Sequence, residues 1–70
     1  MTNAIETAIF QARMDAVSST ALALMKNIAK YQCKENLDIA IEAAAIALSA
    51  SFGGTVEENA EAIEKSIFVK

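Results

Sequence analysis

Residues 10–31 read FQARMDAVSSTALALMKNIAKY, and the spacing of their apolar side chains determines the architecture that we expect. These apolar positions follow one another at alternating intervals of four and three residues. They are Phe10, Met14, Val17, Ala21, Leu24, Ile28 and Tyr31. Side chains at such intervals lie on one face of an α-helix. The stretch therefore predicts a helix with a continuous apolar stripe, which another helix must cover.

The composition indicates an all-α protein with a single domain over residues 1–70. The chain has 70 residues, of which 54% are hydrophobic, and it contains no proline. Gly53 and Gly54 are its only glycines, so they are the only strong helix breakers. Fifteen residues are alanine, which favours helix and lets neighbouring helices approach closely. A single core in so short a chain supplies only about 3–5 kcal/mol, so stability depends on how the helices associate.

The apolar stripe places the first helix at about residues 4–33. Asn3 is a suitable N-cap, and Glu6 follows at the spacing of a capping box. The weak point is residues 18–20, Ser-Ser-Thr, whose hydroxyl groups compete for backbone hydrogen bonds. We expect one continuous helix, with a break at residues 18–20 as the alternative. The same helix carries a second, shorter apolar face, formed by Ile5, Ile9, Ala12, Ala16 and Ala23.

The second helix, at about residues 37–51, is apolar on nearly every side. Asn36 can cap it, and Glu42 is its only charged residue after Asp38. A helix of this kind is normally buried, but two other helices of a 70-residue chain cannot enclose it. We therefore expect the long helix to pack antiparallel to two shorter ones, with homodimerisation completing the three-helix arrangement.

The third helix, at about residues 56–68, is amphipathic. Thr55 and Glu58 form a capping box after the glycine pair. Apolar side chains occupy one face, whereas carboxylates occupy the other, at Glu57, Glu58, Glu61 and Glu64. Positive charge lies instead near the end of the first helix, at Lys26, Lys30 and Lys34, where cations interact favourably with the helix dipole. Each charged set is either solvated surface or an electrostatic contact for a partner.

The sequence predicts no catalysis, no metal site and no cofactor. It contains no histidine, and its carboxylates lie on faces that we expect to be exposed. General acid–base chemistry needs a group whose pKa is shifted by a pocket or a neighbour. We find no glycine-rich phosphate loop and no metal-ligand spacing. Cys33 is the single cysteine, which we interpret as structurally inert, with a redox role beside Lys34 as the alternative.

We expect a cytoplasmic protein, encoded by a cell, a virus or a plasmid. The first twelve residues include Glu6 and no basic segment of the kind that begins a signal peptide. No apolar run approaches the roughly 18 residues needed to span a bilayer. A lone cysteine gives no support for an oxidising compartment.

The surplus of apolar helix surface predicts a small, non-catalytic protein–protein interaction module. Such a module would act as a regulator, an inhibitor or an assembly subunit, and we expect a homo-oligomer, with a dimer favoured, that binds another protein. The residues expected at interfaces are Phe10, Met14, Val17, Leu24, Ile28, Tyr31, Ile39 and Ile46.

Two other kinds of function remain open. One is a DNA-associated regulator, because residues 37–68 match a helix-turn-helix in outline. The acidic third helix argues against nucleic acid, since contact with phosphate depends on Lys and Arg. The other is an amphipathic protein that lies on a membrane surface, although the second helix lacks the basic polar face typical of that class.

Overall fold

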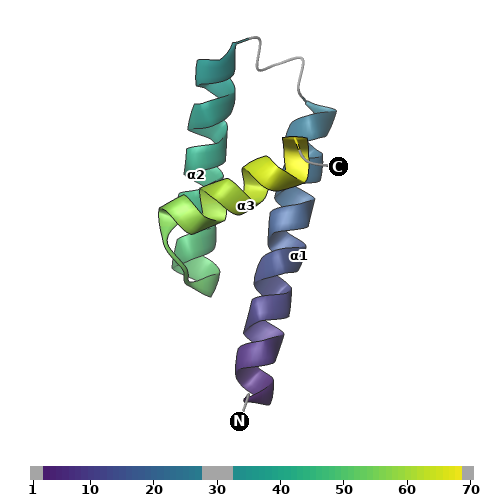
Figure 1. The fold of residues 1–70 in the computed structure, drawn as a ribbon, viewed down its shortest axis with the longest axis vertical. Helices are drawn as coiled ribbons and strands as arrows, with labels where there is room; N and C mark the ends of the chain where they lie inside the picture. The colour runs from purple at the N-terminus through teal and green to yellow at the C-terminus, as the bar shows by residue number, and fades with distance from the viewer. Residues whose placement is uncertain (1–2, 28–32, 69–70) are drawn as a thin grey trace.

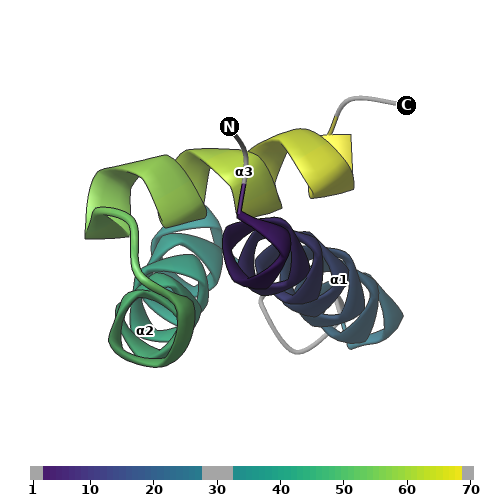
Figure 2. The same ribbon diagram turned by 90° about the horizontal axis from the view of Figure 1, so that it is seen from below.

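The computed structural model describes residues 3–27 and 33–68, which form three α-helices packed together (Figure 1). α1 spans Ala4–Lys26, α2 spans Lys34–Phe52 and α3 spans Val56–Phe68. α1 and α2 lie side by side and run in opposite directions (Figure 1). α3 crosses both helices on one face of this pair (Figure 2). The predicted all-α architecture of three helices is confirmed, but α3 crosses α1 instead of running antiparallel to it.

α1 ends earlier than predicted. Its last residue is Lys26, and Asn27 leaves the helical conformation with φ −110° and ψ 19°. The Asn27 side chain donates a hydrogen bond of 2.9 Å to the carbonyl oxygen of Ala23. Asparagine offers the backbone this local alternative to continued helix, which explains why the apolar spacing alone misjudged the boundary. The predicted extension of the first helix to residue 33 is therefore wrong; Ile28, Lys30 and Tyr31 lie outside the described residues.

α2 begins three residues earlier than predicted. Cys33 is extended and precedes the helix, and Lys34 is its first residue. Asn36, predicted to cap this helix, lies inside its first turn. The ion pair between Lys34 and Asp38, at 3.1 Å and one helical turn apart, stabilises this early start. The predicted range of 37–51 thus falls within the observed helix.

The predicted N-cap of α1 at Asn3 and the predicted capping box of α3 at Thr55 are confirmed. α1 is continuous through residues 18–20, and Asn3 caps it by accepting a hydrogen bond of 2.8 Å from the backbone N–H of Ile5. At α3, the Glu58 N–H donates to the Thr55 hydroxyl at 3.0 Å, and the Thr55 N–H donates to the Glu58 carboxylate at 3.4 Å. This reciprocal capping box fixes the start of α3 one residue after Thr55.

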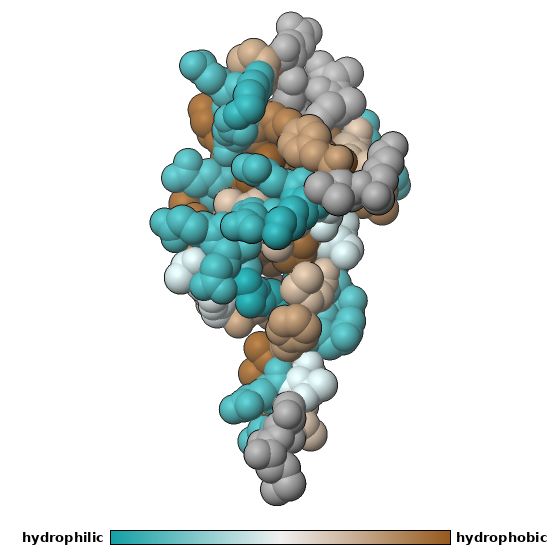
Figure 3. Space-filling model, viewed as in Figure 1, coloured by the Kyte–Doolittle hydropathy of each residue, from teal (hydrophilic) through white to brown (hydrophobic). Residues whose placement is uncertain are grey.

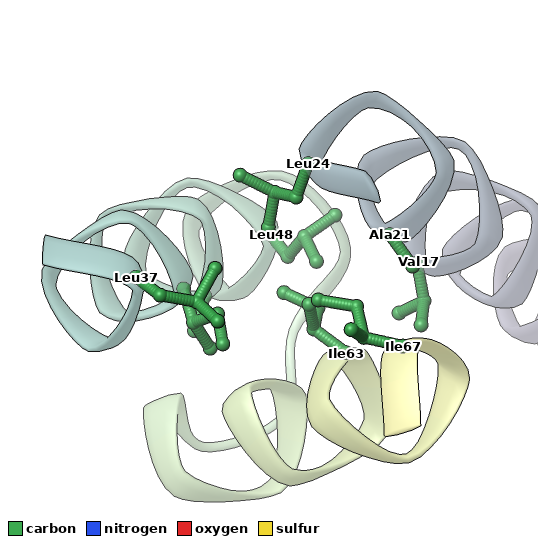
Figure 4. Close-up of a cluster of buried hydrophobic side chains, with 9 residues drawn as sticks. Val17, Ala21, Leu24, Leu37, Leu48, Ile63 and Ile67 are labelled. Atoms are coloured by element: carbon green, nitrogen blue, oxygen red, sulfur yellow. The ribbon is translucent and has the colours of Figure 1, made fainter. Parts of the chain in front are cut away.

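A single core joins the three helices (Figure 4). Each helix contributes side chains of low exposure that point toward a common centre. They are Val17, Ala21 and Leu24 from α1, Leu37, Ile41, Ala45 and Leu48 from α2, and Ile63 and Ile67 from α3. In the described part of the chain, the stripe on α1 is thus buried between residues 17 and 24, partly buried at Met14 and exposed at Phe10. The first half of α1 continues past α2 and α3, which makes the molecule 45 Å long and 21 Å wide (Figure 1).

Candidate functional site

Large apolar side chains remain exposed on all three helices. Eight such side chains in the described part of the chain are exposed by between 38% and 67%. They are Ile5, Ile9, Phe10, Leu22, Met25, Ile39, Ile46 and Phe68. Soluble monomers rarely expose large contiguous apolar patches, and such patches commonly mark binding sites. These side chains fall mainly on two surfaces, one on α2 and one on α1.

The first surface is the outer face of α2, which we define by Ile39, Ala43, Ile46 and Ala50. All four residues are exposed, Ile39 by 65% and Ile46 by 53%. They follow one another at intervals of four, three and four, which places them on one side of the helix. The core residues of α2 lie on the opposite side, so this face points away from the rest of the chain. α2 therefore has two apolar faces, of which the fold buries one.

The second surface is the projecting first half of α1, which we call the α1 arm and define as residues 4–12. Every residue of the arm is exposed, including Ile5, Ile9 and Phe10. Apolar side chains alternate there with hydrophilic ones, whereas hydrophilic side chains dominate the surface of α3 (Figure 3). Phe10 continues the line of the core residues of α1 and is 57% exposed, while Met14 is partly buried where the arm meets the body. The arm thus presents helix surface that no other part of the described chain covers.

The predicted interface residues do not form one surface, since some are buried in the core and others are exposed. Val17 and Leu24 are buried in the chain's own core, so they are not available to a partner. Ile39 and Ile46 are exposed, as is Phe10. Among its described residues, the predicted stripe on α1 is thus buried at Val17, Ala21 and Leu24 and exposed at Phe10, and the outer face of α2 is separate from it.

A buried polar cluster joins the three helices beside the glycine turn. Asn59 of α3 is fully buried and accepts a hydrogen bond of 2.7 Å from Nε of Arg13 in α1. The Asn59 amide donates to the Ser49 hydroxyl at 2.9 Å and to the Gly53 carbonyl oxygen at 3.2 Å, both at the end of α2. Each polar atom of the Asn59 side chain thus has a partner, as a buried amide requires.

Arg13 also covers the turn between α2 and α3. A Cβ atom placed on Gly54 would lie 2.9 Å from Cζ of Arg13 and 2.9 Å from Nη2, so the guanidinium occupies the space where a side chain would extend. Gly54 has a φ of 84°, which glycine adopts without steric cost. Arg13 and Asn59 therefore hold the turn and α3 in place, and we assign them a structural role.

Sequence reasoning overlooked Asn59. The residue lies four positions before Ile63, so it occupies the buried stripe of α3 as a polar side chain. A polar residue at a buried register position is the signal that could have found it, because such a group needs hydrogen-bond partners. Its partners, 46 and 10 residues away along the chain, could not be identified in this way.

The four glutamates of α3 are all exposed, as predicted, but they do not form one surface. Glu57 and Glu64 line a groove against α2, which contributes Asp38 and Glu42. Glu58 and Glu61 instead line a shallow depression that also includes Arg13 and Lys65 of opposite charge. The groove between α2 and α3 is therefore strongly acidic, whereas the depression is of mixed charge.

The predicted row of three lysines does not lie along one helix. Lys26 ends α1, whereas Lys34 begins α2 and pairs with Asp38. The hydrogen bond that Lys34 donates to the Asp38 carboxylate raises the pKa of Lys34 above its ordinary value of 10.5. The attraction of that carboxylate raises it further, with a smaller effect from Glu64. This pairing stabilises the fold below pH 10.5, and the stabilisation is lost as the pH rises through the higher pKa of the folded state.

The described residues offer little else for chemistry. Residues 3–27 and 33–68 contain no group of three or more His, Cys, Asp or Glu side chains placed to hold a metal ion. Cys33 is exposed, and the structure gives it no disulfide within the described chain. No single described helix has the length and apolar composition to cross a membrane, although α2 and α3 together, as a pair bent by 120°, meet that test.

No protein family, no curated protein and no solved structure matches this chain.

Proposed function

We propose that this protein is a non-catalytic interaction module that self-associates and acts by binding another protein, as a regulator, an inhibitor or an assembly subunit. The observation that carries this proposal is the exposure of eight large apolar side chains in the described part of the chain. Burying a side chain of this kind is worth about 1.5–3 kcal/mol, so leaving eight in water forgoes much of the available stabilisation. Binding to other proteins recovers it.

The protein exposes two separate apolar surfaces, so we propose that it contacts more than one other protein chain. The outer face of α2 belongs to the compact body, whereas the α1 arm projects from it. Amphipathic helices commonly bind in hydrophobic grooves through residues at positions i, i+4 and i+7 or i+8. The arm has such a set in Ile5, Ile9 and Ala12, so a foreign protein with an apolar groove is the partner that it fits.

The absolute mass in solution tests self-association. We would measure light scattering after size exclusion over a concentration series and record helicity by circular dichroism on the same samples. The proposal expects a mass that rises above the 7.4 kDa of one chain as the concentration increases, with helicity retained. A folded protein that keeps a mass of 7.4 kDa at every concentration would contradict it.

A DNA-associated regulator is a second candidate, favoured by the geometry of the turn. Three residues, Gly53 to Thr55, separate α2 from α3, and the chain bends by 120° between them. A helix-turn-helix motif has a turn of similar length and angle. However, α3, in the place of the recognition helix, exposes four glutamates, which repel phosphate. A gel-shift assay with duplex DNA at low salt decides: a salt-sensitive shift supports this candidate, and no shift removes it.

A further inference from the structure

We draw no further inference here: the strongest candidate, the groove between α2 and α3 that is lined by Asp38, Glu42, Glu57 and Glu64, is a cluster of exposed carboxylates, and nothing in the described part of the structure shows what ligand it would bind.

Discussion

Asn59 lies at the junction of all three helices. Its side chain is fully buried and has hydrogen-bond partners on α1, on α2 and at the end of α2. A buried amide with every polar atom paired favours one arrangement of its neighbours, because any shift leaves a donor or an acceptor without a partner. The network thus complements the apolar core, which is less specific about the angle at which α3 crosses.

Replacing Asn59 by leucine should destabilise the protein by about 2–4 kcal/mol, because the Arg13 guanidinium and the Gly53 carbonyl lose their partner inside the fold. The measurement is the free energy of unfolding from urea titration. Asn36→Leu, at an exposed position of α2, is the matched control and should change that energy by less than about 0.5 kcal/mol. Equal effects of the two substitutions would contradict the structural role of Asn59.

Gly54 and Arg13 should be energetically coupled. Gly54→Ala places a Cβ atom within 2.9 Å of the guanidinium, so Arg13 must move and its hydrogen bond to Asn59 is lost. In an Arg13→Ala background only the cost of the positive φ remains. A double-mutant cycle on unfolding free energies should therefore give a coupling of about 1–2 kcal/mol. The same cycle with Gly53→Ala is the control and should give almost none, since no atom lies within 4 Å of a Cβ there.

At the scale of single elements, each helix start was readable from local sequence wherever a side chain caps it. The capping box of α3 is the clearest case, with both of its hydrogen bonds formed. The end of α1 was misjudged because Asn27 acts where the apolar spacing continues without interruption. The start of α2 was misjudged because Asn36 was predicted as the N-cap, whereas the helix already begins at Lys34, which pairs with Asp38. Periodicity reports which face a helix buries, and side-chain hydrogen bonds decide where it ends.

Removing the N-cap of α3 should loosen that helix selectively. Thr55→Ala deletes the hydroxyl that accepts from the Glu58 N–H, and we expect a loss of about 1 kcal/mol in unfolding free energy. Thr55→Ser keeps the hydroxyl and should restore most of the stability. Chemical denaturation measures both variants, and a serine variant as unstable as the alanine variant would argue against the capping box.

At the scale of the whole molecule, stability is distributed unevenly. The core side chains come from residues 17–24 of α1, from α2 and from α3, whereas residues 4–12 contribute none. The molecule is therefore a compact body with a helical arm (Figure 1). An isolated helix of this length is marginal in water, so the arm depends on continuity with the rest of α1.

Hydrogen exchange should reveal this gradient. At low protein concentration, backbone amides of residues 8–12 should exchange at least about 10-fold faster than those of residues 17–24, because only the latter are covered by α2 and α3. NMR or mass spectrometry measures the two rates. Uniform protection along α1 would mean that the arm is covered in solution. Protection that rises with protein concentration would then indicate a cover by a second copy, whereas protection that does not change would indicate contacts within one chain.

The sequence alone was enough to predict three helices, the face of α1 that carries the buried Val17, Ala21 and Leu24, and the capping box at Thr55, because these features depend on neighbours within four positions. Only the tertiary structure showed that the stripe on α1 is exposed at Phe10, that α2 turns Ile39 and Ile46 outward, and that Asn59 is buried among polar partners. Periodicity defines apolar faces on a helix but not which of them another helix will cover. That choice depends on how α3 leaves the glycine turn and crosses the other two helices.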